Sequence, residues 1–449
     1  MSSNWSVKKL GDLVTFLSGG TPSKSNKDYW NGEIPWISAS SMQSTRYHDS
    51  DLRVTSLGST NGTRLVPAET VLLLVRGGAL HNKIPVGITT REVTFNQDVK
   101  ALVPKSEDIT PYYLLAWLIS SRELLLGKVE NTGIGAGKLD TKILQDLDVP
   151  VPPKAELLRL ELFSKALDDK IILNQNINHT LEQMAQALFK SWFVNFEPVK
   201  AKMAVLEAGG SQEDAMLAAM TAISGKDDDA LVVFEREHPE QYAELKATAE
   251  LFPSAMQDSE LGNIPVTWEL GKLQDLLVLQ RGFDLPSSAR KDGEFPLIAA
   301  SGPNGTHNVA MAKAPGVITG RSGVLGKVYL TLEDYWPLNT TLWVKEFKRA
   351  TPCYAYELLR LLDMKAFNAG SAVPSLNRNH IHSLSYPLPP MALVNLFESS
   401  ALLLHQRAHV NLKHSQSLAL LRDTLLPKLL SGEITLPEAE QAVSEAENV

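Results

Sequence analysis

Residues 131–140 read NTGIGAGKLD, with three glycines followed by a lysine. Such a loop can cradle phosphates, because glycines let backbone amides approach the oxygens and the lysine adds positive charge. A complete phosphate loop needs a glycine, four residues, and then Gly-Lys followed by Ser or Thr. Here Thr132 stands at the first glycine position and Leu139 follows Lys138. The motif fails at both ends, which argues against nucleotide binding.

Other catalytic patterns are incomplete as well. A DNA methyltransferase needs Asn or Asp before Pro-Pro and an aromatic residue after it, whereas this chain has PVPPK and PLPPM at residues 150–154 and 387–391. The ten histidines form no HExxH motif, and no serine lies in GxSxG. His380 and His382 alternate as on a strand, where a surface pair is favoured over a metal site. The residues therefore favour a binding or assembly protein over an enzyme.

The chain repeats itself, which explains the glycine-rich stretch better. Residues 131–153 and 368–390 align without a gap and share Asn131/Asn368, a glycine, two leucines and three prolines. Earlier matches keep the same order: LGDL with LGKL, IPWISAS with FPLIAAS, VRGG with GRSG, and TPYY with TPCY. Chance similarity would not preserve order, so we infer a duplication. Because the second copy has Pro374-Ser375 in place of Gly137-Lys138, the shared pattern serves to turn the chain.

A long helix is expected after each proline pair, over residues 154–193 and 391–430. A seven-residue series in each helix is apolar except for one asparagine: Leu160, Leu167, Asn174, Leu181 and Leu188, then Phe397, Leu404, Asn411, Leu418 and Leu425. A less pure second series in the first helix is Phe163, Lys170, Ile177, Met184 and Ser191. Heptad seams of this kind indicate a coiled coil, in which a buried Asn fixes register.

Each copy is expected to be a mixed α/β domain. Short apolar runs at residues 70–76, 99–104, 316–321 and 340–345 predict strands, and residues 112–125 and 355–367 predict helices. The 449 residues are too many for one ordinary core. The single cysteine excludes disulfide frameworks and suits a reducing cytoplasm, and no run of residues resembles a membrane helix.

The net charge of −8 conceals a mildly basic body. Residues 196–262 hold 14 acidic and 5 basic side chains, a net of −9, and residues 431–449 hold 5 acidic and no basic ones. Removing these two segments leaves the remaining chain with a net charge of +6. Such a balance permits nucleic-acid binding without requiring it.

These features resemble the DNA-specificity subunit of type I restriction–modification systems. The resemblance covers nearly the whole chain, and its carriers are the duplicated Gly…Leu…Pro-x-Pro-Pro segments and the sequences LEQMAQALFKSWFVNFEPVKAKM (residues 181–203) and LLPKLLSGEI (residues 425–434). It implies an α+β fold, with two mixed α/β target-recognition domains in a pseudo-two-fold repeat joined by two long helices that form an antiparallel coiled coil. In that geometry Asn174 should meet Arg407 or His414 rather than Asn411.

The resemblance divides the chain into recognition domains at residues 1–150 and 263–388, long helices at 151–195 and 389–432, an acidic helical connector at 196–262 and an acidic tail at 433–449. It implies a non-catalytic subunit that recognises a bipartite, asymmetric double-stranded DNA target in the cytoplasm. The implied partners are two modification subunits, which methylate adenine with S-adenosylmethionine, and two restriction subunits, which use ATP and Mg. No cofactor or metal is expected in this chain, and no membrane contact.

Base readout favours Arg or Lys for guanine and Asn or Gln for adenine, so polar loops supply the DNA-binding candidates. In the first copy these are Thr21, Ser23, Lys24, Ser40, Arg46, Arg76, His81, Lys83 and Lys138. In the second they are Arg281, Ser288, Arg290, Lys291, Asn304, His307, Arg321, Lys327, Asn377 and Arg378. Arg76 and Arg321 are favoured because each follows a predicted strand in matched glycine-flanked loops. Asn174 and Asn411 are the candidates for helix register.

Three other interpretations remain open. The chain could be a coiled-coil adaptor that binds only protein, the specificity subunit of a related restriction enzyme class, or an enzyme such as a nucleotide hydrolase. DNA binding would separate the first interpretation from the favoured one, and nucleotide binding would identify the last.

Overall fold

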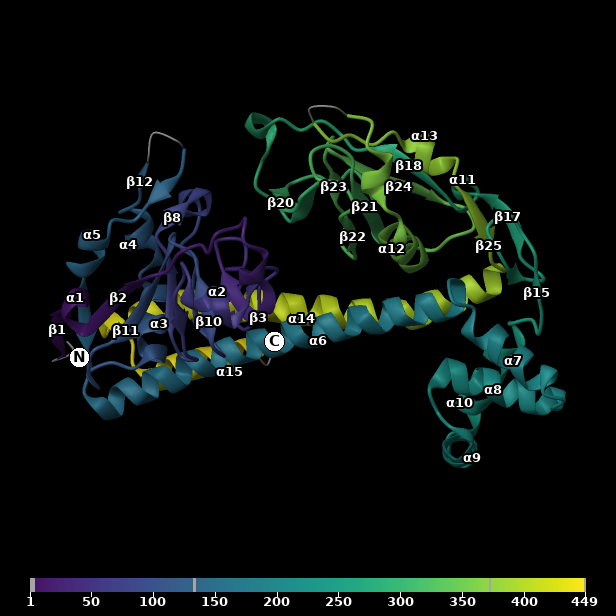
Figure 1. Cartoon of the computed structure of the whole chain (residues 1–449), viewed down its shortest axis with the longest axis horizontal. Coiled ribbons are helices and arrows are strands. Elements are labelled where there is room, and N and C mark those ends of the chain that lie inside the picture. The colour runs from purple at the N-terminus through teal and green to yellow at the C-terminus, as the bar shows by residue number, and fades with distance from the viewer. Residues whose placement is uncertain (1–4, 132–134, 371–372, 448–449) are drawn as a thin grey trace. The chain divides into compact units, whose positions relative to one another are not determined.

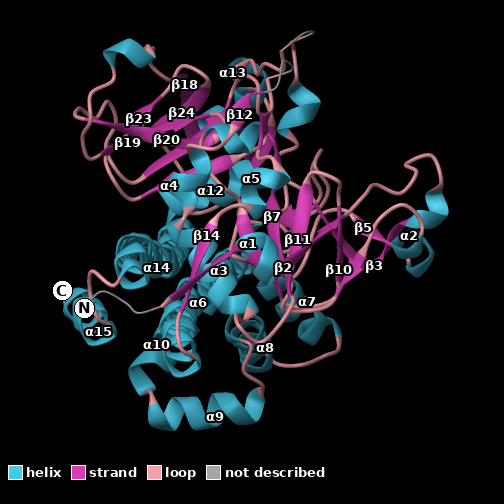
Figure 2. Cartoon of the chain, turned by 90° about the vertical axis from the view of Figure 1, so that its left-hand side faces the viewer, coloured by secondary structure: helices cyan, strands magenta, loops and turns pink. Residues whose placement is uncertain are grey.

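The computed structural model describes residues 5–131, 135–370 and 373–447. Its contacts divide the chain into two units, of which unit 1 comprises residues 1–175 and 412–449 and unit 2 comprises residues 176–411. Both contain sheets and helices, as Figures 1 and 2 show, which confirms the mixed α/β class expected from the sequence. No helix in the described ranges is long and apolar enough to cross a membrane.

Unit 1 is built around a five-stranded sheet in the order β2-β11-β7-β9-β4. Its strands are β2 (Val14–Ser18), β4 (Arg46–Tyr47), β7 (Val71–Leu74), β9 (Val86–Thr89) and β11 (Val99–Pro104). Helix α3 (Pro111–Ser120) packs on β7 and β9, and α4 (Arg122–Leu126) follows it. Every residue of β7 is buried, because this strand lies at the centre of the sheet with α3 on one face.

Smaller sheets complete unit 1. A four-stranded sheet has the order β5-β3-β10-β6, and β1 pairs with β14. The bounds are β1 (Ser6–Lys9), β3 (Trp30–Ile37), β5 (Arg53–Val54), β6 (Leu65–Val66), β10 (Val93–Phe95) and β14 (Asp148–Val151). Short helices are α1 (Leu10–Leu13), α2 (Ser56–Thr60) and α5 (Thr141–Gln145). A further three-stranded sheet, β12-β13-β8, belongs to the site below.

Unit 2 repeats this plan with fewer strands. Its main sheet has the order β18-β24-β21-β22, with β18 (Leu277–Arg281), β21 (Gly316–Gly320), β22 (Val328–Thr331) and β24 (Thr341–Phe347). Helix α12 (Pro352–Leu361) packs on β21 and β22, just as α3 packs on β7 and β9. The parallel pair β3–β10 likewise recurs as β19 (Phe295–Ala299) with β23 (Trp336–Pro337). The duplication inferred from the sequence is therefore present in the fold.

The remaining elements of unit 2 flank this sheet. They are β15 (Met256–Gln257), β16 (Ile264–Pro265), β17 (Glu269–Lys272), α11 (Leu273–Leu276), β20 (Gly302–His307), α13 (Arg378–His382) and β25 (Ser385–Leu388). The strand expected at His380 and His382 is wrong, because both lie in α13. There the His382 Nε2 atom accepts a hydrogen bond from the Leu279 amide at 2.9 Å, so this ring holds α13 against β18.

The acidic segment forms a small helical body within unit 2. It consists of α7 (Glu197–Glu207), α8 (Gln212–Ser224), α9 (Asp228–Glu237) and α10 (Pro239–Glu250), as Figure 2 shows. The Lys202 amine is buried and donates to the carbonyl oxygens of Ala249 and Phe252 at 2.7 and 2.6 Å. This lysine therefore ties α7 to the last turn of α10 and to Phe252 just beyond it.

Two long helices, α6 (Lys154–Phe193) and α14 (Met391–Ser431), contribute to both units. Within each unit their segments lie side by side and run antiparallel (Figure 1). Asn174 faces His414 in unit 1, and Asn178 faces Asn411 in unit 2. In unit 1 Asp168 also faces Arg422, and in unit 2 Trp192 also faces Phe397, so the two segments run in opposite directions within each unit, as the family resemblance implied.

The second seam of α6 differs from the one expected. The series Phe163, Lys170, Ile177, Met184 and Ser191 is wrong, since Ile177 and Met184 are 37% and 52% exposed. The side chains that turn inward instead are shifted by one position: Leu157, Ser164, Ile171, Asn178, Ala185 and Trp192. The seven-residue spacing was correct. The wrong series was chosen because the apolar residues Ile177 and Met184 lie on the exposed face of α6.

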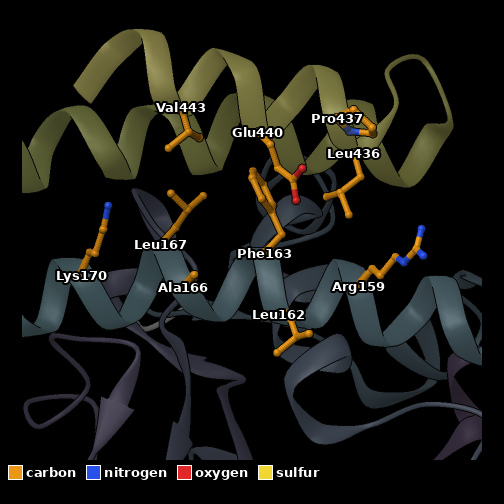
Figure 3. Close-up of a pocket in the computed structure, with 10 residues that line it drawn as sticks. All are labelled: Arg159, Leu162, Phe163, Ala166, Leu167, Lys170, Leu436, Pro437, Glu440 and Val443. Carbon is orange, nitrogen blue, oxygen red and sulfur yellow. The ribbon is translucent and has the colours of Figure 1, made fainter. Parts of the chain in front are cut away.

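Phe163 has a different partner, the C-terminal helix α15 (Leu436–Glu447). The sequence suggested only an acidic tail here, yet Ala439 is fully buried in the core of unit 1. Figure 3 shows α15 above α6, with Leu436 and Val443 directed towards Phe163 and Leu167 across a groove. Thr435 starts α15 by bonding through its amide and hydroxyl to the Glu438 carboxylate, at 2.6 and 2.8 Å.

Candidate nucleic-acid interface

The described residues of the first copy's glycine-rich stretch contribute to an arm beside a strand end. This arm is the three-stranded sheet of β12 (Glu130–Asn131), β13 (Gly137–Lys138) and β8 (Arg76–Gly77). Lys138 lies opposite Arg76 in the register, and Gly137 lies opposite Gly77. The arm thus brings together two cationic candidates that are far apart in the sequence. Arg76 is exposed, whereas Lys138 is half-buried and pairs with Asp140 at 2.9 Å.

The glycines of this arm allow close packing. A Cβ atom on Gly137 would lie 2.8 Å from the Leu80 Cβ and 2.9 Å from the Val129 Cγ1, so these neighbours would have to shift. Gly77 has a φ of 146°, which side chains disfavour. Both glycines therefore serve to seat β13 against β8. Gly133, the first glycine of the stretch, lies outside the described residues.

Neighbouring loops join the same surface. The 3-10 turn Gly78–His81 follows β8, and the His81 Nε2 atom lies 3.0 Å from the Gly135 carbonyl oxygen. Lys83 donates to the Gln43 side chain at 3.4 Å, which links it to the loop that carries Ser40. These hydrogen bonds connect three of the loops that the sequence selected, and His81 and Lys83 remain exposed.

The second copy builds the same arrangement from different residues. Arg321 follows β21, and its carbonyl oxygen accepts from the Leu376 amide at 2.9 Å. Ser322 bridges to Ser375, and Leu376 bridges to Asn368. Three segments again lie side by side at a strand end, with Ser375 where the first copy has Lys138. The Arg321 side chain is partly exposed, with Nη1 3.5 Å from the Asn339 carbonyl oxygen.

Most of the remaining candidates lie on exposed loops. Those with exposed side chains are Ser23, Lys24, Ser40, Ser288, Lys291, Asn304, Lys327, Asn377 and Arg378. Thr21 is partly buried and donates to Gln97 at 2.7 Å, and Arg290 is partly buried. Asn377 also caps α13, because its side chain accepts from the Asn379 amide at 3.0 Å. The exposed group is free to meet a ligand without rearrangement of a core.

Three candidates are engaged in contacts inside their own units. The His307 ring is 6% exposed, lies 3.1 Å from the Lys291 amide and packs edge-on against Trp336. Arg281 pairs with Asp284 at 3.0 Å. The Arg46 side chain is 10% exposed and lies against α6. These contacts favour a structural role for His307 and Arg46, whereas Arg281 remains about half exposed.

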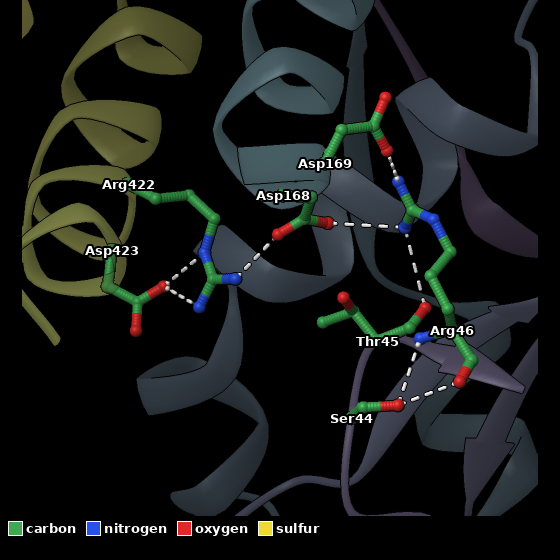
Figure 4. Close-up of polar contacts among 7 residues, drawn as sticks. All are labelled: Ser44, Thr45, Arg46, Asp168, Asp169, Arg422 and Asp423. Atoms are coloured by element: carbon green, nitrogen blue, oxygen red, sulfur yellow. Dashed lines mark hydrogen bonds and ion pairs between the residues drawn. The ribbon is translucent and has the colours of Figure 1, made fainter. Parts of the chain in front are cut away.

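Arg46 belongs to a buried charge cluster that sequence reasoning missed. Figure 4 shows Asp168 of α6 between two guanidinium groups, with Arg46 Nη1 at 3.3 Å and Arg422 Nη1 at 2.7 Å. Asp169 holds the other end of Arg46 at 3.2 Å, and Asp423 holds Arg422 at 2.8 Å. Burial alone would lower the pKa of Arg422, but Asp168 and Asp423 raise it on balance. The cluster therefore fixes β4 and α14 to α6 through ion pairs.

The chain is similar in sequence to a family of known proteins. Residues 2–183 match the family described as type I restriction modification DNA specificity domain. The chain is 29% identical over 366 residues to the type I restriction enzyme HindI specificity subunit of Haemophilus influenzae, covering 74% of this chain and 79% of that one. It is 24% identical over 450 residues to the MjaIX specificity subunit of Methanocaldococcus jannaschii, covering 97% and 94%.

Two further similarities cover a smaller share of the chain or have a lower sequence identity. The EcoR124I/EcoR124II specificity subunit of Escherichia coli is 33% identical over 155 residues, which is 34% of this chain and 38% of that one. The crystal structure of a type I restriction–modification S subunit from M. genitalium aligns with a TM-score of 0.47 and 14% identity, over 95% of this chain and 96% of that one.

Proposed function

We propose that this chain, which belongs to the specificity subunits of type I restriction enzymes, selects the DNA sequence on which its partner subunits act. Its role is target recognition rather than catalysis, as in the rest of that family. The observation that carries the proposal is the repeated arm: each α/β copy presents a glycine-flanked arginine at the same strand end, with different residues around it.

The two copies would recognise the two halves of a bipartite, asymmetric double-stranded target. Residues 1–150 would form the first recognition domain and residues 263–388 the second. Arg76 and Arg321 have the fork of donors that pairs with guanine in the major groove, and the exposed loop residues around them would contact further bases or phosphates. Because the surroundings of the two arginines differ in sequence, the two half-sites should differ as well.

The long helices would form the rod between the recognition domains and the docking site for partners. A helix of 40 residues is about 60 Å long, enough to bridge sites one DNA turn apart. Two modification subunits would bind along residues 151–195 and 389–432 and methylate adenine with S-adenosylmethionine. Two restriction subunits would add ATP- and Mg-dependent cleavage. The assembly would act in the cytoplasm, and the acidic body at residues 196–262 would lie away from DNA because phosphates repel it.

Reconstitution tests this proposal. Purified chain is combined with its modification subunit and S-adenosylmethionine, and methylated adenines are mapped on genomic DNA. We expect one bipartite, asymmetric motif, which disappears when either component is omitted. Methylation, ATP hydrolysis or DNA cleavage by the purified chain alone, in proportion to its concentration, would contradict the proposal. An adaptor that binds only protein would fail to shift duplex DNA both with and without the modification subunit.

A further inference from the structure

The buried Asp168–Arg422 ion pair occupies positions that differ between the two repeats. The sequence repeat relates α6 to α14 with an offset of 237 residues, so that Asn174 corresponds to Asn411. By the same offset Asp168 corresponds to His405, and Arg422 corresponds to Ala185. All four side chains are buried, with exposures of 2%, 8%, 6% and 0% in that order. Equivalent seam positions therefore carry a charged pair in unit 1 and an uncharged, smaller combination in unit 2.

The helix register shows what each residue faces. In unit 1, Asp168 meets Arg422 while Asn174 meets His414, an antiparallel arrangement. In unit 2, Asn178 meets Asn411 and Trp192 packs on Phe397, which continues the same direction. This register places Ala185 opposite His405. The His405 ring also packs edge-on against Tyr356, and burial lowers its pKa to about 4, so it is neutral at pH 7.

Matched apolar seams would otherwise let each helix pair with its own copy in a second chain. If α6 met a second α6 in this register, Asp168 would face Ala185 and lose the Arg422 guanidinium. If α14 met a second α14, Arg422 would face the neutral His405 ring and lose its carboxylate. Removing one partner of a buried ion pair is strongly unfavourable, because the remaining charge stays out of water. Only α6 with α14 sets Asp168 against Arg422, whereas either like pairing leaves Asp168 with Arg46 alone and Arg422 with Asp423 alone.

We propose that the Asp168–Arg422 pair selects the pairing of α6 with α14 and disfavours the pairing of either helix with the same helix of a second copy. In the light of the function proposed above, this selection keeps two different recognition domains in one subunit. A pair of identical α6 helices would instead present two copies of the first domain, which suits a palindrome. The ion pair thus keeps the two recognition domains of the assembly different, as an asymmetric target requires.

The test moves the arginine from α14 to α6 in the full-length chain. The variant Ala185→Arg/Arg422→Ala places both partners on α6, so two copies can each set Asp168 against the other's introduced guanidinium through an α6–α6 interface. The same chain folded on itself cannot form this contact. We expect light scattering to report the mass of two chains for this double variant and of one chain for the wild type. The single variants Ala185→Arg and Arg422→Ala should remain monomeric, because neither gains a pair from dimerisation.

A third substitution distinguishes a change of helix partner from a general loss of folding. Adding His405→Asp gives the arginine introduced on α6 an acidic partner on α14 of the same chain, next to Arg360, whose guanidinium packs on Tyr356. The triple variant should therefore return to one chain. If the double variant does not fold, a folded, monomeric triple variant supports the proposal by itself. A double variant that stays monomeric at all concentrations overturns it, as does a triple variant that dimerises or fails to fold.

This experiment does not depend on DNA or on partner subunits. If the double variant dimerises but the wild-type chain directs no methylation, the pairing rule stands and the proposed function fails. If the double variant is monomeric while methylation by the wild type proceeds as expected, the function stands and the pairing rule fails.

Discussion

Asn174 of α6 faces His414 of α14, with 3.3 Å between the Asn174 Nδ2 and His414 Nδ1 atoms. The heptad spacing predicted Arg407 or His414 as the partner of Asn174, and this contact confirms the second choice. Asn411 in turn donates to the Asn178 side chain at 3.0 Å, and Asn178 donates to the Ala408 carbonyl oxygen at 2.8 Å. Polar residues thus meet polar residues in both units, although Asn178 was not among the residues expected.

Replacing both asparagines of the seam by leucine should affect register more than stability. In Asn174→Leu/Asn411→Leu, about 1–3 kcal/mol lost per group left without a partner is offset by about 1.5–3 kcal/mol gained per buried leucine. We expect an unchanged or higher Tm, and methylation of targets whose spacer is one base pair longer or shorter. Leu167→Asn is the control, since it should lower the Tm without relaxing the spacer. An intact spacer preference in the double variant would refute the register role.

Arg76→Ala and Arg321→Ala should each impair one half-site only. Loss of a bidentate contact to a base typically costs about 1–3 kcal/mol, and each arginine belongs to a different copy. Competition binding with each half-site scrambled in turn measures this effect. Arg64→Ala, at an exposed position outside both arms, is the control. Equal loss of affinity for every sequence would instead mean that the arginines contact phosphates.

Gly137→Ala should damage the first arm, whereas Gly135→Asn should not. The added Cβ at Gly137 would press on Leu80 and Val129, and overpacking of this kind costs about 1–3 kcal/mol. Gly135 has a φ of 75° with open space around its Cβ, a conformation that asparagine tolerates. We expect weaker binding to the first half-site for Gly137→Ala alone. Equal behaviour of the two variants would show that β13 does not position Arg76.

Glu357 should make stability depend on pH. Burial raises the pKa of this carboxyl to about 7, and Glu182 adds to the rise while Arg360 opposes it. An unfolded glutamate titrates near pH 4.3, so between about pH 4 and 7 the folded chain holds a proton that the unfolded chain releases. The resulting stability is fully present below that range and is lost as the pH rises through 7.

The variant Glu357→Gln carries no charge at any pH and should remove this dependence. Above pH 7 we expect its free energy of unfolding to exceed that of the wild type by up to about 3 kcal/mol. Urea unfolding at pH 5, 6 and 8 measures the difference, with Glu92→Gln, at an exposed position, as the control. A difference that does not grow with pH would show that Glu357 is ionised in the folded chain.

The sequence determined the elements whose signals are local or periodic. The bounds Val99–Pro104 for β11 and Lys154–Phe193 for α6 coincide with the expected ones, because hydrophobic runs, breakers and heptad spacing are properties of neighbouring residues. The duplication and its matched arginines were likewise present in the order of the residues. The failed motifs around Lys138 and the histidines favoured a binding protein over an enzyme, and the duplicated segments carried the resemblance to a family of specificity subunits.

Only the tertiary structure decided which side chains meet. It placed Lys138 opposite Arg76, turned Arg46 towards Asp168, and buried His307 beside Trp336, because these contacts join residues far apart in the chain. It also assigned Phe163 to α15 instead of the seam between the long helices. A polar residue in a loop has the same local sequence whether it faces solvent or a buried carboxylate. Packing between distant segments makes that choice, and with it decides which cationic side chains remain exposed.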